Sequence, residues 1–342
     1  MTPALRILEP GVATLQDCGR HGYQRYGVPV SGALDQAGLA IANILAGNSP
    51  CTAAIEIVSA GFAIEIEARS VTLALAGAAA ELTLQDEKAH SRIAPFQSFT
   101  ARRGNTVRIP PPRGGAVSYL AVEGGFDIAP ALGSLSTYRR AALGGYEGRT
   151  LGLGDCLPLR LASSERAPVC IDVDISAPGV LRVMRGPNAE YFCPHAFEML
   201  FASLYTVSPA SDRMGLRLQG ARLDRATQGE LPSQGTTAGG LQVPADGQPI
   251  LLLGDRQTTG GYPRIATVIG ADIAAAGRLC SSMSVSFKEV SREEAVGLLL
   301  AQQAWLASLP AALKPAHANT LSAEHLLSSN LIGGVTAGLH DD

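Results

Sequence analysis

The ten positions after Gly254 are rich in polar side chains, among them Asp255, Gln257, Thr258, Thr259, Tyr262 and Arg264. The same stretch contains the pair Gly260-Gly261, and glycine lets backbone N–H groups approach a ligand closely. A hairpin turn requires only the glycines and at most one aspartate. The stretch therefore favours a binding loop, because loops held by a rigid scaffold commonly carry function. A polar turn with capping side chains is the alternative.

Several kinds of site are excluded by the motifs that the chain lacks. A phosphate-binding P-loop needs a lysine directly after a glycine, and none of the three lysines, Lys88, Lys288 and Lys314, follows one. Their neighbours do not fit a biotin-carrier lysine either. The zinc motif HExxH and the nucleophile elbow GxSxG are also absent. The remaining chemistry uses carboxylates, arginines, hydroxyls and amides, with no metal site predicted.

Two short strands are expected to position the loop. Residues 250–253 form an apolar run of the length of a buried strand, and residues 265–269 are rich in β-branched side chains. Apolar runs and alternating patterns predict further strands at 5–8, 62–67, 70–75, 106–109, 116–122, 180–184 and 205–207, and residues 12–17 lead into a loop.

Helices are predicted where apolar residues recur with a period of 3.6. Apolar side chains at positions 34, 37, 41, 44 and 45 lie on one helical face, with Ser31 as the cap and Gly47 as the left-handed stop. Asp35 falls in the first turn, where the helix dipole favours an anion. Residues 188–202 predict a short amphipathic helix. Ser291 and Glu294 form a capping box for a last helix that extends to position 310.

Composition predicts a two-domain, β-rich protein. The length of 342 residues suits two domains, and 46% hydrophobic against 17% charged residues is enough for a sizeable core. The 38 glycines are dispersed between short apolar runs, which indicates many turns. A net charge of −3 gives no reason to expect a nucleic-acid partner.

The cysteines and the hydropathy pattern predict a cytoplasmic protein. The six cysteines form no C-x-x-C pair and have no histidine at zinc-site spacing, so reduced, buried thiols are expected. The chain begins without a signal-peptide stretch. No uninterrupted apolar run reaches the ~18–20 residues of a transmembrane helix, so no membrane contact is expected.

Three charged positions outside the loop also need an explanation. Glu56 interrupts the apolar stretch 55–57, and a buried carboxylate requires a partner, so a structural ion pair is the first interpretation. Arg20 lies in a polar, aromatic loop of the kind that lines small-molecule sites; a surface loop with structural arginines is the alternative. Asp212 and Arg213 are neighbours, and such a pair is commonly a weak local salt bridge.

An ordered series of motifs over positions 5 to 290 resembles one family. Each motif alone is weak, but their order is specific. The chain is similar to the allophanate hydrolase subunit 2 family, also called the biotin-dependent carboxyltransferase-like or KipA family. The motifs include Gln16-Asp17-Cys18-Gly19-Arg20, Ser31-Gly32-Ala33-Leu34-Asp35, Glu123-Gly124-Gly125-Phe126-Asp127, Ser211-Asp212-Arg213-Met214-Gly215, Gln242-Val243-Pro244 and the loop itself.

The resemblance implies a mainly β fold with a few helices, built from tandem cyclophilin-like β-barrel domains. The first domain is expected at 1–165, the second at 166–290, and a helical C-terminal segment at 291–342. In this family the motif containing Asp212 and Arg213 lies close to the Gly254 loop, the loop of Arg20 faces the active region, and a glutamate occurs at the position of Glu56.

The same resemblance implies an amide or lactam substrate. A base must lie within hydrogen-bond reach of the amide N–H, and we predict Asp255 in that role. Arginine donors suit an anionic transferred group, so Arg264, Arg213 and Arg20 are predicted anion ligands. The side chains predicted to orient the amide are Gln257, Thr258, Thr259 and Tyr262, with Asp212 and Glu56 as further candidates.

The C subunit of the bacterial ATP-dependent 5-oxoprolinase belongs to this family. The resemblance therefore implies cleavage of 5-oxoproline to glutamate with ATP and Mg²⁺, in a complex with a KipI-like B subunit, as well as the A subunit. One alternative is the carboxyltransferase component of a urea or amide carboxylase, in which biotin is only a partner's prosthetic group. Another is a non-enzymatic, KipA-like regulator that binds a kinase inhibitor. The chain departs from the family at Arg278, where relatives usually carry glutamine.

Overall fold

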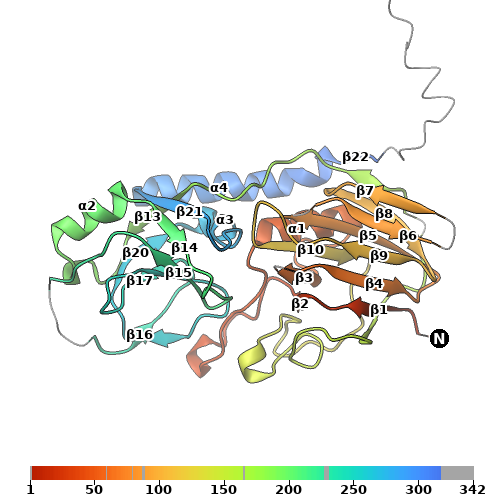
Figure 1. The fold of residues 1–342 in the computed structure, drawn as a ribbon, viewed down its shortest axis with the longest axis horizontal. Coiled ribbons are helices and arrows are strands. Elements are labelled where there is room, and N and C mark those ends of the chain that lie inside the picture. The colour runs from red at the N-terminus through yellow and green to blue at the C-terminus, as the bar shows by residue number, and fades with distance from the viewer. Residues whose placement is uncertain are drawn as a thin grey trace, which may run out of the picture.

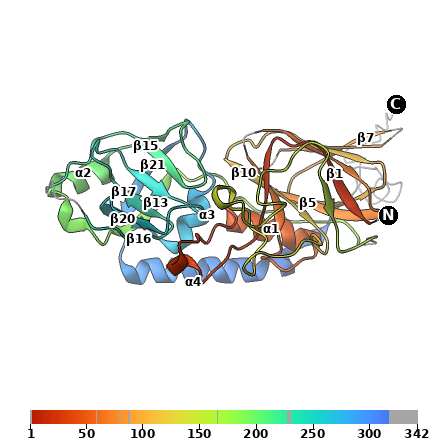
Figure 2. The same cartoon turned by 90° about the horizontal axis from the view of Figure 1, so that it is seen from below.

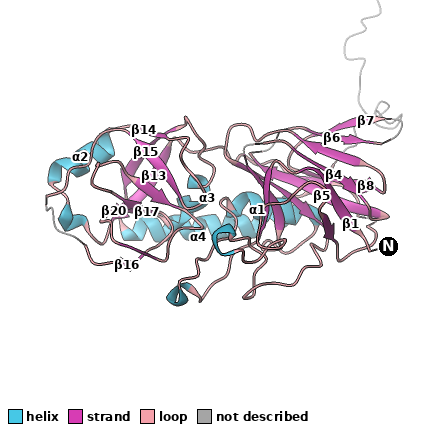
Figure 3. Cartoon of the chain, turned by 60° about the horizontal axis from the view of Figure 1, so that its bottom comes forward, coloured by secondary structure: helices cyan, strands magenta, loops and turns pink. Residues whose placement is uncertain are grey.

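The computed structural model describes residues 2–58, 60–78, 80–86, 89–164, 166–226 and 231–316. Lys88 and residues 317–342 of the predicted C-terminal segment lie outside the described residues. Strands dominate the described part, while helices gather between its two strand-rich regions and at one end (Figure 3). The prediction of a mainly β protein with a β-barrel is confirmed.

Two sheets pack face to face in the N-terminal region, here called the sandwich (Figure 1). Alternate side chains of each strand point inward, so Leu5 and Ile64 from one sheet meet Leu15 and Leu73 from the other in a fully buried core. In spatial order, the first sheet contains β11 (Cys156–Pro158), β1 (Ala4–Glu9), β4 (Phe62–Ile66), β9 (Thr106–Ile109), β6 (Leu82–Gln85) and β7 (His90–Ile93). The second contains β2 (Val12–Gln16), β3 (Ala54–Val58), β10 (Val117–Val122), β5 (Ser70–Gly77), β8 (Gln97–Arg102), β12 (Val169–Cys170) and β22 (Lys314–Pro315).

The next region is a closed barrel that ends on a parallel pairing of its first and last strands, β13 and β21. In spatial order its strands are β13 (Val180–Arg185), β20 (Arg264–Val268), β17 (Gly240–Gln242), β18 (Ile250–Leu252), β15 (Gly215–Gln219), β14 (Tyr205–Val207) and β21 (Ser284–Glu289). A separate two-stranded ribbon pairs β16 (Gln234–Gly235) with β19 (Thr259–Gly260). The predicted domain boundaries at 165 and 290 stay predictions.

Helix α1 (Gln36–Ala46) fills the junction between the sandwich and the barrel. It packs on β5 and β10 of the second sheet and contacts α3 (Ile273–Ala276) of the barrel region (Figure 2). Its residues Leu39, Ile41 and Leu45 belong to the same buried cluster as the barrel core. This explains why nearly every residue of α1 is buried: both of its sides are covered.

The predicted cap of α1 is wrong. Asp35, not Ser31, occupies the N-cap, and its Oδ1 accepts a hydrogen bond from the Ala37 N–H at 3.1 Å. Ser31 has a φ of +56° and Gly32 one of +86°, so the chain bends through this pair and the helix begins only after Asp35. The predicted stop is confirmed, since Gly47 ends the helix with a φ of +81°.

Helix α4 (Arg292–Ser308) runs along both the barrel and the sandwich (Figure 1). Ser291 caps it by accepting from the Glu294 N–H at 3.1 Å, as predicted. Together with η5 (Leu309–Ala312), it is long and apolar enough to cross a membrane by length and composition, and only 6% of that window is buried. Because one such helix is weak evidence of a span, the expectation of no transmembrane helix stays a prediction.

The remaining helices are short. The predicted helix at 188–202 is divided into the 3₁₀ turn η3 (Ala189–Tyr191) and α2 (Pro194–Ala202), because Pro194 starts a new helix at its first turn. Two other 3₁₀ turns, η1 (Gln24–Tyr26) and η2 (Arg139–Ala141), lie in long loops that project from the sandwich next to the barrel (Figure 1). The last, η4 (Gly270–Asp272), precedes α3.

The prediction that all cysteines are reduced is wrong for one pair. Cys18 and Cys51 form a disulfide with their Cα atoms 5.2 Å apart. Cys18 follows β2 and Cys51 follows the end of α1, so tertiary packing brings together two loops that the sequence separates by 33 residues. The other four cysteines are free. Disulfides persist mainly in oxidising compartments, so the cytoplasmic localisation stays a prediction.

Removing the disulfide should lower stability. A cross-link that closes a loop of this length restricts the unfolded chain and is worth about 2–4 kcal/mol. We expect Cys18→Ser or Cys51→Ser to lower the free energy of unfolding in urea by about that amount, with Cys193→Ser, which removes a free thiol, as the control. An oxidised wild type no more stable than Cys18→Ser would contradict the cross-link.

Candidate functional site

The polar loop leaves the barrel after β18 and faces the sandwich. The Gly254 carbonyl accepts a hydrogen bond from the Ser31 N–H at 3.1 Å, and the Asp255 N–H donates to the Arg213 carbonyl at 3.0 Å. A Cβ added to Gly254 would lie 3.2 Å from the Ser31 carbonyl oxygen. The start of the loop is therefore pressed against the bend that precedes α1.

Arg213 connects the two regions through its guanidinium. Its Nε donates to Asp255 Oδ2 at 2.9 Å and its Nη2 to Asp255 Oδ1 at 3.2 Å. The same Nη2 donates to the Gly32 carbonyl at 2.6 Å, and Nη1 pairs with Glu56 Oε1 on β3. Arg213 is thus not a weak local partner of Asp212. It bridges a barrel carboxylate and a sandwich carboxylate, and the ion pair expected for Glu56 is this one.

A buried hydrogen-bond chain continues from Glu56 into α1. Glu56 Oε2 accepts from the Leu34 N–H at 2.9 Å and from the Tyr119 hydroxyl at 2.7 Å. The Tyr119 oxygen in turn accepts from the Asp35 N–H at 2.8 Å, and Asp35 Oδ1 accepts from Arg278 Nη1 at 3.0 Å. Glu56, Tyr119 and Asp35 are fully buried, and all of their side-chain oxygens except Asp35 Oδ2 are hydrogen-bonded inside the protein.

The charges of this network are set by burial and by the neighbouring ions. Burial alone would lower the pKa of Arg213, but Glu56 and Asp255 outweigh it, so the pKa is raised above its ordinary value. Burial, and then the Glu56 carboxylate, raises the pKa of Tyr119 well above its ordinary value. Burial raises the pKa of Asp35, with Arg278 acting in the opposite direction. The phenol therefore stays protonated and donates to Glu56.

Arg20 interacts with Asp255, but its guanidinium is incompletely hydrogen-bonded. Its side chain is 1% exposed, its Nη2 donates to the Ser136 carbonyl, and its Nε and Nη1 have no partner among the described residues. Burial lowers its pKa, while Asp17 and Asp255 act to raise it. Arg213 therefore contacts both Asp255 and Glu56, and Arg20 interacts electrostatically with Asp255.

Another part of the loop lines a cavity of about 250 Å³ at the end of the barrel. Gln257 and Tyr262 contribute from the loop, and Asp212 contributes from the motif before β15. Gln257 Nε2 donates to Gln242 Oε1 at 3.0 Å, which fixes the two amides against each other. The remaining lining residues are Arg140, Ala210, Met214, Gly215, Arg217, Gln242, Ile250 and Leu252.

The rest of the loop packs against the β16–β19 ribbon through Thr258, Thr259 and Arg264. The Thr258 carbonyl accepts from the Thr236 N–H at 2.9 Å, and Thr259 pairs with Gly235 in the β16–β19 ribbon. Arg264 is buried, and its guanidinium donates to the Gly235 carbonyl at 2.8 Å and to Gln234 Oε1 at 3.1 Å. None of these three residues lines the cavity. Their predicted contacts with a ligand stay predictions.

Several residues at these sites were missed from the sequence. Tyr119 had a detectable signal, because the register of β10 against β3 places it directly opposite Glu56, and a lone carboxylate in an apolar strand needs such a donor. Gln242 carried only the weak signal of its family motif, and Arg140 and Arg217 were not predicted as site residues. They lie far apart in the sequence, on η2, β15 and β17, and only the packing of the barrel end brings them to one cavity.

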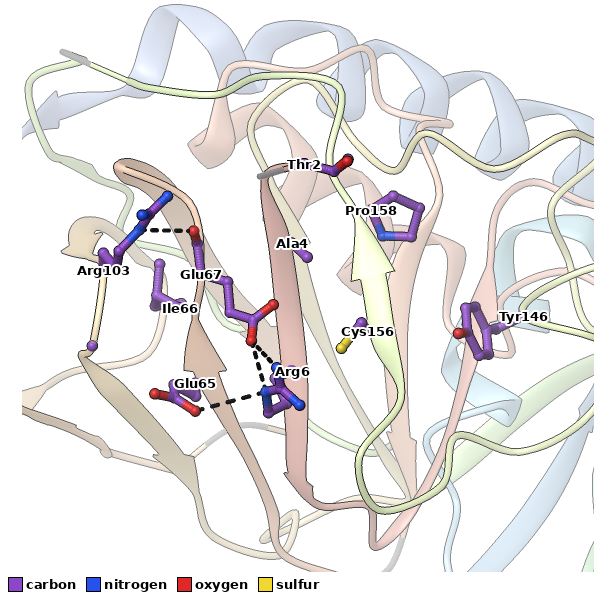
Figure 4. Close-up of a pocket in the computed structure, with 11 residues that line it drawn as sticks. Thr2, Ala4, Arg6, Glu65, Ile66, Glu67, Arg103, Tyr146, Cys156 and Pro158 are labelled. Atoms are coloured by element: carbon purple, nitrogen blue, oxygen red, sulfur yellow. Dashed lines mark hydrogen bonds and ion pairs between the residues drawn. The ribbon is translucent and has the colours of Figure 1, made fainter.

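A larger cavity, about 830 Å³, lies on the outer face of the sandwich around β1, β4 and β11 (Figure 4). Its charged groups pair with one another. Arg6 Nε donates to Glu67 Oε1 at 2.7 Å and lies 3.9 Å from Glu65, while Arg103 Nε donates to the Glu67 carbonyl at 3.1 Å. Since its charges are mutually satisfied and it lies away from the Gly254 loop, we do not assign the site there.

Removing Arg213 should destabilise the fold strongly. Arg213→Ala leaves the Glu56 and Asp255 carboxylates buried without their partner, and breaking a buried pair in this way costs about 3–5 kcal/mol. Urea unfolding measures the loss. Arg222→Ala is the control, because its pair with Asp224 is at the surface and is worth about 1 kcal/mol or less. Equal, small losses in both variants would contradict the bridging role of Arg213.

Comparison with known proteins places the chain in a family. The model of the carboxyltransferase domain, subdomain A and B, matches residues 26–289. The chain is 37% identical over 306 residues to the 5-oxoprolinase C subunit of Escherichia coli, covering 89% of this chain and 97% of that protein. It is 36% identical over 288 residues to the 5-oxoprolinase C subunit of Haemophilus influenzae, covering 84% of this chain and 91% of that protein.

The fold also agrees with a solved relative. The crystal structure of the Kluyveromyces lactis urea amidolyase superposes with a TM-score of 0.83 at 26% sequence identity. The match covers 93% of this chain but only 21% of that protein, so this chain corresponds to about one fifth of the amidolyase. The resemblance carried by the ordered motifs is confirmed: the chain belongs to the carboxyltransferase domain family, subdomain A and B.

Proposed function

We propose that this chain is the C subunit of a heteromeric, ATP-dependent 5-oxoprolinase that cleaves 5-oxoproline to glutamate. One observation carries the proposal: the similarity to two proteins of that name spans 97% and 91% of their lengths. The match to the amidolyase covers one fifth of a much longer protein. That match keeps the carboxyltransferase reaction as the second candidate, because the fold agreement itself is close.

The arrangement of the Gly254 loop suits a lactam substrate. Its first polar side chain, Asp255, is held at the junction by Arg213, while Gln257 and Tyr262 reach the cavity. We assign the lactam to this cavity, where amide and hydroxyl groups can orient a planar C=O and N–H. Asp255 is the proposed base, and it does not itself line the cavity. Both of its oxygens accept hydrogen bonds from Arg213, so proton transfer to Asp255 requires one of those bonds to loosen and the carboxylate to turn toward the cavity.

ATP and Mg²⁺ are assigned to the assembled complex. Mg²⁺ is usually held by one or two carboxylates together with substrate phosphates. Among the described residues, no three histidine, cysteine, aspartate or glutamate side chains gather as metal ligands, and Glu56, Asp255 and Asp35 are each paired with an arginine. We derive no step through the metal here.

The proposed partners are a KipI-like B subunit plus the A subunit. Co-expression of the three chains should yield a complex that consumes ATP and 5-oxoproline and releases glutamate, whereas this chain alone should not. Coupled assays of phosphate and glutamate measure the outcome. Carboxylation of urea by carboxybiotin would instead support the second candidate. Tight binding of a kinase inhibitor without turnover would support a regulator.

Replacing the proposed base should abolish turnover while keeping the fold. We expect Asp255→Asn to lower kcat of the complex by about 10²–10⁴-fold, the range of a general base. Circular dichroism and co-purification of all three chains test folding and assembly. Asp224→Asn, which alters only a surface ion pair, is the matched control. An assembled Asp255→Asn complex with wild-type kcat would refute the assignment.

A further inference from the structure

The cavity at the end of the barrel contains two arginines whose guanidiniums are not engaged. Arg140 comes from η2 of the sandwich and Arg217 from β15 of the barrel, and both line the same 250 Å³ space. Within the described part of the chain, neither guanidinium takes part in a hydrogen bond or ion pair. Both side chains are exposed, whereas the largely buried Arg213, Arg264 and Arg278 are all hydrogen-bonded within the protein.

The one acidic residue of the cavity does not neutralise them. Asp212 Oδ1 accepts from the Met214 N–H at 2.8 Å and from the Gly215 N–H at 3.3 Å, so the carboxylate closes its own turn. Two positive charges against one negative charge leave the cavity with an excess positive charge. An arginine guanidinium presents paired N–H donors that match a carboxylate, so this part of the cavity suits an anionic group.

Two glutamine amides also line the cavity, and one of them has an unpaired donor. Gln242 is 2% exposed and its Oε1 accepts from Gln257, but its Nε2 has no partner among the described residues. Leaving a buried donor unpaired is costly, so this nitrogen is an independent indication of a missing acceptor. A Cβ on Gly260 would lie 2.6 Å from that nitrogen, which explains why the loop carries glycine there.

We propose that this cavity binds a small ring or chain that carries both a carboxylate and an amide, with Arg140 and Arg217 on the carboxylate and the Gln242–Gln257 pair on the amide. The proposal rests on the function proposed above and assigns which groups recognise its lactam acid. A volume of about 250 Å³ is small beside the ~300–1,000 Å³ of pockets for drug-sized ligands. Tyr262, which is half-exposed, also lines the cavity.

The position of Arg140 makes the cavity a shared site. Arg140 belongs to the sandwich side, whereas Arg217, Gln242 and Gln257 belong to the barrel side. The junction network around Arg213 therefore has to hold the two regions together for both arginines to reach one carboxylate. Gln257 also lies only two residues after Asp255, which is bound to Arg213. The position of Gln257 at the ligand amide is therefore coupled to the Arg213 bridge.

The test compares variants of the co-expressed complex. Arg140→Gln and Arg217→Gln each remove one charged contact to the carboxylate, and we expect KM for 5-oxoproline to rise about 10- to 100-fold with KM for ATP unchanged. Gln242→Leu should raise the same KM. Arg139→Gln is the matched control, because Arg139 is the neighbouring exposed arginine on η2 and does not line the cavity. Unchanged KM for 5-oxoproline in both cavity arginine variants would overturn the proposal.

Calorimetric binding separates this proposal from the proposed function. The wild-type complex should bind 5-oxoproline more tightly than 2-pyrrolidinone, which lacks the carboxylate, and cyclopentanecarboxylate, which lacks the amide. Arg140→Gln should weaken 5-oxoproline binding to the level of 2-pyrrolidinone. If the complex binds in this order without turnover, the cavity assignment stands and the 5-oxoprolinase function falls. If turnover occurs while Arg140→Gln and Arg217→Gln bind 5-oxoproline like the wild type, only the cavity assignment falls.

Discussion

The bridge formed by Arg213 is the interaction on which the rest of the structure depends. One buried guanidinium holds Asp255 of the barrel, Glu56 of the sandwich and the Gly32 carbonyl at the bend before α1. Desolvating three charges is expensive, and here the cost is offset because every oxygen of both carboxylates accepts a hydrogen bond. The arrangement works only when the two regions meet in one orientation, so it specifies their docking as well as stabilising it.

This bridge also anchors the Gly254 loop, whose middle residues line the barrel-end cavity. The beginning of the loop is immobilised at the junction, while Gln257 and Tyr262 extend to the cavity at the barrel end. The end of the loop is tied to the β16–β19 ribbon by Arg264. A loop anchored at both ends presents its middle side chains with little conformational freedom, which lowers the entropy cost of ordering them around a ligand.

Arg278, the position at which relatives usually carry glutamine, contacts residues at the junction of the sandwich and the barrel and does not line the cavity. Its guanidinium donates to Asp35 at the cap of α1 and to the Ser176 carbonyl at 3.1 Å. Arg278 therefore balances a buried carboxylate where a glutamine would supply only a neutral amide. Because Arg278 does not line the barrel-end cavity, the replacement leaves the residues proposed to recognise the ligand intact.

The sequence by itself determined part of the strands, the family and the loop, because alternation, β-branched runs and ordered glycine motifs are local signals. It also identified Glu56 as a carboxylate in need of a partner. Only the tertiary structure decided which partner that is, placed the cap of α1 at Asp35, joined Cys18 to Cys51, and paired Arg264 with Gln234 and Gly235. The physical reason is the same in each case: these contacts depend on how segments pack in space, and their geometry exists only after the sandwich and the barrel have packed around α1.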